Sequence, residues 1–108
     1  MGNVSRFIEP VVLRILKEKK KSYGYEIADC LPQYALTDAT IEGAALYRTL
    51  RTLEANGYVC STWDNGDGPA RRNYCLTRAG HTHLLDWAHL LKSLGRKMVA
   101  FQREVAAR

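Results

Sequence analysis

The sequence predicts a mainly α-helical protein with a two-stranded β-hairpin and a long C-terminal helix. Three observations predict this fold: apolar residues at helical spacing in several segments, a Gly-rich turn between two short β-type runs, and a seven-residue apolar repeat near the C-terminus. With 108 residues the chain is long enough for one compact domain with a modest core. We expect residues 1–77 to form its head and residues 78–108 to form the C-terminal helix.

The composition bounds the classes of function. A formal net charge of +5 favours an anionic partner, most commonly nucleic acid, although a merely soluble basic protein fits the charge equally well. No run approaches the roughly 18 apolar residues of a membrane span, and the start does not resemble a signal peptide. The three cysteines are widely spaced, with no close pair to hold zinc. We therefore expect a cytoplasmic protein with no membrane segment, cofactor or metal site. The sequence contains no recognisable catalytic constellation, so we do not expect an enzyme.

Two helices are expected at the start of the chain. The first is predicted to begin near residues 7–10, because Pro10 is tolerated only in the first turn of a helix. Ser22 is predicted to cap a second helix over residues 23–34, and Pro32 is predicted to end it.

A third helix is expected over residues 41–56, capped by Thr40 and stopped by Gly57. Its inward-facing positions follow helical spacing and are Leu46, Leu50 and Leu53. The opposite side carries Arg48, Arg51, Thr52 and Ala55. Two helices joined in this way are typical of a helix-turn-helix.

Residues 58–64 and 71–76 are rich in β-branched and aromatic side chains and flank a short Gly/Pro loop, which predicts a β-hairpin. A helix-turn-helix followed at once by a hairpin is a winged helix. If the hairpin is symmetric about residues 67 and 68, Cys60 lies opposite Cys75. A disulfide there would act as a redox switch, but a reducing cytosol argues against its formation.

Thr77 is predicted to cap the last, long helix. An unbroken heptad seam runs along it, with residues Leu84, Trp87, Leu91, Leu94, Met98, Phe101 and Val105. Gly95 weakens this helix by about 1 kcal/mol relative to alanine, so a partner is needed to stabilise it. Because a helix of this length overruns so small a core, we expect the seam to bind a second copy of the chain in a homodimer.

The outer face of the third helix suits the major groove, where exposed side chains read base edges and backbone contacts fix the register. Tyr47, Arg48, Arg51 and Thr52 are the candidates, although an ordinary amphipathic helix with a cationic outer face has the same pattern. In the hairpin, Gly66, Gly68 and Pro69 would let the tip lie close to a sugar–phosphate surface.

Arg71 and Arg72 follow this tip and alternate sides of the strand, so one of them can face the DNA backbone or the minor groove. Two solvated arginines at a strand end are the alternative interpretation. Asp64 and Asp67 oppose this positive charge locally, which argues against a purely electrostatic clamp.

Three segments resemble the PadR family of bacterial transcriptional regulators: "SYGYEI", "ALYRTLRTLEANGYV" and "GPARRNYCLTRAG". The likeness covers residues 7 to about 85, and the wing motif is its most specific part. It implies a dimeric winged-helix repressor whose C-terminal dimerisation helix pairs two copies on a palindromic double-stranded DNA operator. Ala44 and Ala45 stand where the family commonly has Gly-Thr or Gly-Ser, although Ala45 can still touch a thymine methyl group. The expected DNA-contacting residues are Ser22, Tyr23, Ala45, Tyr47, Arg48, Arg51, Thr52, Gly68, Arg71 and Arg72.

The resemblance also implies an effector site for a small aromatic ligand at the dimer interface, where the ligand would stack on a tryptophan ring. Its candidate residues are Phe7, Val11, Trp87, Leu91 and Met98. A plain interface anchor is the alternative role of Trp87. The alternative function for the whole chain is a winged-helix protein-interaction module that contacts an acidic protein, which would show no DNA sequence preference.

Overall fold

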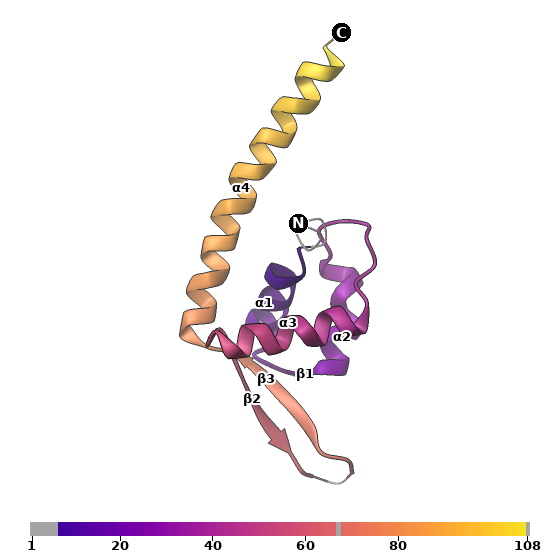
Figure 1. The fold of residues 1–108 in the computed structure, drawn as a ribbon, viewed down its shortest axis with the longest axis vertical. Coiled ribbons are helices and arrows are strands. Elements are labelled where there is room, and N and C mark those ends of the chain that lie inside the picture. The colour runs from indigo at the N-terminus through magenta and orange to yellow at the C-terminus, as the bar shows by residue number, and fades with distance from the viewer. Residues whose placement is uncertain (1–6, 67, 108) are drawn as a thin grey trace.

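The computed structural model describes residues 7–66 and 68–107. Along the chain it forms α1 (Ile8–Lys19), β1 (Lys21–Tyr23), α2 (Gly24–Tyr34), α3 (Gly43–Ala55), β2 (Val59–Asp64), β3 (Arg71–Leu76) and α4 (Arg78–Ala106) (Figure 1). The helices α1 to α3 gather beside a small sheet, the β2–β3 hairpin projects from one end, and α4 leaves in the opposite direction. The predicted fold, mainly helical with a wing and a long C-terminal helix, is confirmed.

The core lies between α1, α2 and α3. Leu46, Leu50 and Leu53 of α3 have no exposed surface, as their spacing predicts. They pack in one cluster with Ile27 of α2 and with the apolar residues of α1. Because α1 is buried on most of its surface, it is the central helix of the head.

A third strand, β1, was not expected from the sequence. The strand order is β1-β3-β2 with antiparallel pairing, and β1 places Lys21 opposite Cys75 and Ser22 opposite Tyr74. Ser22 therefore lies in a strand and not at a helix cap, so the prediction of a Ser22 cap is wrong. Helix α2 begins two residues later, and the Glu26 carboxylate accepts the backbone N–H of Tyr23 at 2.8 Å.

Two other helix boundaries also differ from the prediction. Helix α2 continues through Pro32 to Tyr34: the fixed φ of proline is compatible with a helix, although its ring removes one backbone hydrogen bond and crowds the preceding turn. Helix α3 is preceded by Glu42 as its N-cap residue, two positions after the expected Thr40. The end of α3 is as predicted: Gly57 has φ +80, a left-handed conformation that glycine adopts without strain.

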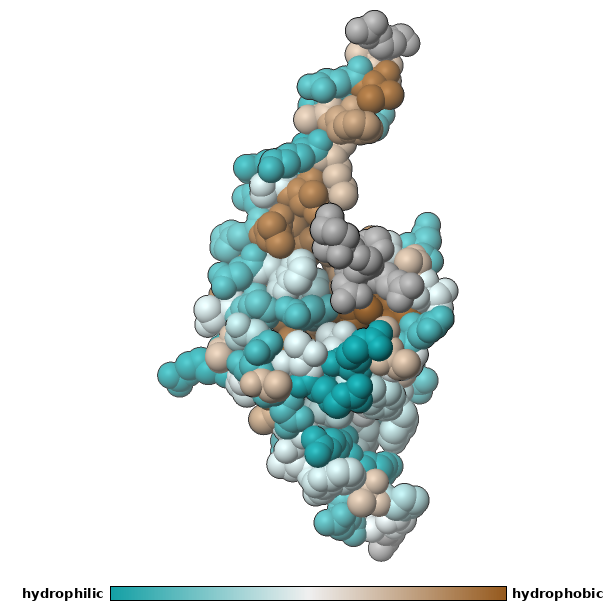
Figure 2. Space-filling model, viewed as in Figure 1, coloured by the Kyte–Doolittle hydropathy of each residue, from teal (hydrophilic) through white to brown (hydrophobic). Residues whose placement is uncertain are grey.

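Helix α4 begins as predicted, with the Thr77 hydroxyl oxygen accepting the backbone N–H of Gly80 at 3.0 Å. Its first turns lie beside α1, and the rest extends away from the head, so the molecule measures 63 × 26 × 23 Å. Met98, Phe101 and Val105 are 57%, 69% and 61% exposed on this extension. Figure 2 shows apolar surface along it. Within the described residues, no helix is long and apolar enough to cross a membrane.

Candidate nucleic-acid interface

The outer face of α3 carries the predicted side chains in two rows. Tyr47 borders a hollow beside the wing, whereas Arg48 and Thr52 border a second hollow beside the start of α1 and α4. The Thr52 hydroxyl donates to the Arg48 carbonyl at 3.1 Å, so its hydrogen is already used within the helix. Tyr47, Arg48 and Arg51 are exposed on this face.

Tyr47 owes its position to a glycine in another helix. A Cβ atom built on Gly24 would lie 2.6 Å from Cε1 and 2.8 Å from the hydroxyl oxygen of Tyr47. The tyrosine ring therefore rests directly on the backbone at the start of α2, where only glycine leaves room. This contact joins two motifs that lie more than twenty residues apart in the sequence.

Arg71 lies across β1 and the start of α2. Its guanidinium group lies 4.3 Å from the centre of the Tyr23 ring, and its Nη1 donates to the Tyr25 hydroxyl at 3.3 Å. The two tyrosine rings are stacked, with centres 5.7 Å apart. These cation–π and hydrogen-bond contacts hold Arg71 at the edge of a hollow of about 330 Å³ between α2, α3 and the hairpin.

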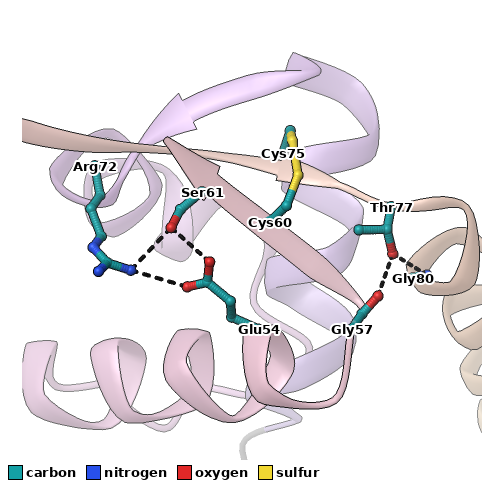
Figure 3. The surroundings of a disulfide bond; sticks show 8 residues. All are labelled: Glu54, Gly57, Cys60, Ser61, Arg72, Cys75, Thr77 and Gly80. Atoms are coloured by element: carbon teal, nitrogen blue, oxygen red, sulfur yellow. Dashed lines mark hydrogen bonds and ion pairs between the residues drawn. A yellow bond between two sulfur atoms is a disulfide. The ribbon is translucent and has the colours of Figure 1, made fainter. Parts of the chain in front are cut away.

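Arg72 lies on the opposite side of β3, which confirms the predicted alternation of the two arginines. Its Nη1 donates to the Glu54 carboxylate at 3.2 Å and to the Ser61 hydroxyl oxygen at 3.0 Å, while that hydroxyl donates to Glu54 at 2.7 Å (Figure 3). The guanidinium also lies 4.9 Å from the centre of the Trp63 ring. Arg72 therefore ties the wing to the C-terminal turn of α3, a contact that sequence patterns do not reveal.

An acidic residue in the wing is used internally. The Tyr23 hydroxyl donates to the Asp64 carboxylate, and the backbone N–H of Gly66 donates to it at 3.1 Å. These bonds hold the pKa of Asp64 below its usual value, and the first of them raises the pKa of Tyr23. Asp64 thus joins β1 to the wing; Asp67 lies outside the described residues.

Two residues of the expected interface are buried. Ser22 is 2% exposed in β1 and Ala45 is 7% exposed on the inner side of α3, so neither side chain can reach a nucleic acid. We correct both predictions on this ground. Gly68 is exposed, with φ +127, and Tyr23 is half-buried beneath Arg71.

A tight junction links the end of α3 to the start of α4. The Thr77 hydroxyl donates to the Gly57 carbonyl at 2.6 Å (Figure 3). The Thr77 N–H donates to the Tyr58 carbonyl at 3.1 Å. A Cβ atom built on Gly80 would lie 1.9 Å from the Tyr58 carbonyl oxygen. The close approach permitted by Gly80 fixes the direction of α4 relative to α3.

Cys60 and Cys75 are joined by a disulfide, which corrects the expectation that they remain separate thiols (Figure 3). The predicted register is confirmed, because the two residues are direct partners across β2 and β3 with Cα atoms 5.4 Å apart. Direct partners on antiparallel strands point to the same face of the sheet, which brings the two sulfur atoms together. Cys30 is free.

Trp87 is held by the N-terminal part of α1. Its indole N–H donates to the Glu9 carboxylate at 2.8 Å, and Nε2 of His83 lies 2.5 Å from the same oxygen. The Phe7 ring meets the Trp87 ring edge-on, with centres 6.4 Å apart. These contacts set the angle between α1 and α4.

Four of the five expected effector residues line two neighbouring hollows, and Trp87 lines both. A hollow of about 350 Å³ is bordered by Phe7 and Trp87, and another of about 480 Å³ is bordered by Val11, Trp87 and Leu91. Met98 borders neither and lies two turns further along α4. Among residues 7–66 and 68–107, no group of three or more His, Cys, Asp or Glu side chains is arranged to hold a metal ion.

The transcriptional regulator PadR-like family matches the chain over residues 12–86, which include the helix-turn-helix, the wing and the first turns of α4. The chain belongs to this family. PadR-like proteins are transcriptional regulators and not enzymes, in agreement with the sequence prediction.

Relatives of known sequence or structure share this head. Transcriptional regulator Rv3488 of Mycobacterium tuberculosis is 36% identical over 66 residues, which are 61% of this chain and 62% of that protein. A PadR family transcription regulator from Clostridium difficile R20291 is 26% identical with a TM-score of 0.75, covering 88% of this chain and 97% of that chain. Bacillus subtilis PadR, solved in complex with operator DNA, is 23% identical with a TM-score of 0.65, covering 77% of this chain and 47% of that chain. The last likeness shows the shared PadR fold.

Proposed function

We propose that this PadR-like protein is a homodimeric repressor that binds a palindromic operator in the cytoplasm. The observation that carries the proposal is the exposed group of Tyr47, Arg48 and Arg51 on the outer face of α3, flanked by a wing whose arginines are held in fixed positions. The operator-bound structure of the Bacillus subtilis relative supports the same role for this fold.

In the proposed complex α3 enters the major groove. Arg48 and Arg51 donate to guanine edges or phosphate oxygens, and the Tyr47 ring contacts the adjacent backbone. The wing lies along the neighbouring backbone or minor groove, with Gly68 in its exposed tip and Arg71 beside the tip at the start of β3. Arg72 acts mainly as a positioning residue, because Glu54 and Ser61 already hold its guanidinium group.

The homodimer is proposed from the exposed apolar face of α4. Phe101 is 69% exposed on a helix of 29 residues that extends well beyond the head. Burying such a side chain stabilises an assembly by about 1.5–3 kcal/mol. Pairing of this face with a second copy would set two recognition helices about 34–36 Å apart, the spacing of successive major grooves.

Small-molecule control is the remaining part of the proposal. A flat aromatic effector at the dimer interface would lie against Trp87, between the hollows bordered by Phe7 and by Leu91. Because Trp87 is hydrogen-bonded to Glu9 of α1, a ligand there would change the angle of α4 and thus the spacing of the two heads.

The test compares three variants on a DNA fragment selected from the source genome by the protein itself. Arg48→Ala and Arg51→Ala should each weaken binding to that fragment by about 1–3 kcal/mol if the side chain reads a base. Arg96→Ala removes the same charge from the outer face of α4, away from the heptad seam, and should change the affinity little. Equal losses for the α3 variants and Arg96→Ala, or equal affinity for a scrambled fragment, would refute the proposal and favour a protein partner.

A further inference from the structure

A row of two cysteines and one lysine crosses the outer face of the sheet. Cys60 on β2 and Lys21 on β1 are both direct register partners of Cys75 on β3. This face is opposite to the one on which Arg72, Ser61 and Glu54 interact, because neighbouring residues on a strand point to opposite faces. The row therefore lies at the root of the wing, on the same strand face as Arg71 but four residues along β3 from it.

The three residues differ in a way that suits thiol–disulfide exchange. Cys60 is exposed and accessible to a small reagent, whereas Cys75 is half-buried. Lys21 is exposed directly across from Cys75, and a neighbouring cation favours the reactive thiolate over the thiol. Cys30, in contrast, lies on α2 and packs against the core.

We propose that Cys60 and Cys75 form a reversible dithiol–disulfide site that reacts with low-molecular-weight disulfides and thereby sets how firmly the wing is held against α3. The exposed Cys60 thiolate attacks the small disulfide, forms a mixed disulfide and expels one thiolate. The Cys75 thiolate then attacks the Cys60 sulfur, closes the protein disulfide and expels the second thiolate. Two electrons and two protons thus pass from the protein to the small disulfide, which leaves as two thiols.

The position of the bond explains its effect on the wing. Cys60 is the immediate neighbour of Ser61, which bridges Glu54 of α3 and Arg72 of β3. Closing the disulfide fixes the register of β2 and β3 at the residue pair next to this bridge. In a reducing cytosol the site would be open, and it would close when small disulfides accumulate, as is usual for cytosolic redox sensors.

The first experiment needs no DNA. The reduced full-length protein is incubated with oxidised glutathione, and its free thiols are counted by alkylation and mass spectrometry. We expect the count to fall from three to one, with Cys60 and Cys75 in one cross-linked peptide, and to return to three after addition of reduced glutathione. Cys30→Ser should keep the cross-link and Cys60→Ser should lose it. A wild-type count that stays at three, or a cross-link that includes Cys30, would overturn the proposal.

The role of Lys21 is tested by the rate of the second step. Lys21→Gln should slow closure and let the mixed disulfide accumulate on Cys60, whereas Lys19→Gln on α1 should close at the wild-type rate. Equal rates in both variants would remove Lys21 from the proposed mechanism.

The effect on the wing is read in two ways. Amide hydrogen exchange of β2 and β3 should be slower in the oxidised protein than in the reduced one. Equal exchange rates would overturn the wing effect.

The second reading rests on the proposed function. Oxidation should tighten operator binding by roughly three- to tenfold, because a wing that is already fixed loses less conformational entropy on binding. If the reduced wild type binds its operator and oxidation leaves that affinity unchanged, redox control is refuted. If neither form binds any selected fragment, the proposed function fails, while the thiol count and exchange rates still decide the redox site.

Discussion

Replacement of Gly80 by alanine tests the junction between α3 and α4. The added methyl carbon would lie 1.9 Å from the Tyr58 carbonyl oxygen and 2.7 Å from a methyl carbon of Leu76, whereas Cβ atoms essentially never approach closer than 3.0 Å. The obstacle at Tyr58 is backbone, so the start of α4 must move by more than 1 Å. That movement separates Thr77 from the carbonyl groups of Gly57 and Tyr58.

The magnitude follows from these contacts. Loss of two hydrogen bonds costs about 0.5–1.5 kcal/mol each, and overpacking costs a further 1–3 kcal/mol or so. Alanine recovers about 0.5–1 kcal/mol through its better helix propensity. We therefore expect Gly80→Ala to lower the free energy of unfolding by about 1–5 kcal/mol, a large fraction of the stability of a small domain.

The assay is urea unfolding followed by circular dichroism at one fixed protomer concentration, because association would otherwise shift the midpoint. Gly43→Ala is the matched control: Gly43 is the first residue of α3, and a Cβ atom there would meet nothing within 4 Å among the described residues. The control should be neutral or slightly stabilising. Equal stability of the Gly80 and Gly43 variants would refute the role assigned to this junction.

Two further predictions concern the dimer and the wing. Phe101→Asp should convert the dimer to monomers in sedimentation experiments, because it places a charge in the apolar seam. Val99→Asp, at a position outside the seam, should leave the dimer intact. A Phe101→Asp protein that stays dimeric would exclude the α4 interface. Tyr23→Phe should raise the pKa of Asp64 towards its usual value in a carbon-13 NMR titration, while Tyr25→Phe, whose hydroxyl does not contact Asp64, should leave it near the wild-type value. Since the folded pKa of Asp64 is lowered, its stabilising effect is present at neutral pH and is lost as the pH falls through that folded value. The variant should therefore lose less stability on acidification, and an unchanged Asp64 pKa would contradict this assignment.

Features with a local chemical signal could be predicted from the sequence. The leucine spacing of α3 identifies its buried side, Gly57 marks its end, and the Thr77 hydroxyl caps α4. The register that pairs Cys60 with Cys75 follows from the position of the turn. Each of these depends on residues that are close in the sequence, or on the symmetry of one hairpin.

Features that depend on distant contacts could not be predicted. A strand as short as β1 has no pattern of its own and forms because β3 offers a free edge; this pairing buries Ser22, which resembles a helix cap in the sequence. The same limit applies to Tyr47 above Gly24 and to the bond between Trp87 and Glu9. These pairs come from separate elements, and only the folded chain brings them together.

A hydroxyl-radical footprint on a selected genomic fragment tests most directly whether two paired α3 helices read DNA. We expect two protected segments related by a two-fold axis, with centres about 10–10.5 base pairs apart, and the loss of both segments with the Arg48→Ala variant. A single protected segment, or protection that does not depend on the DNA sequence, would contradict the proposal of a dimeric, sequence-specific regulator.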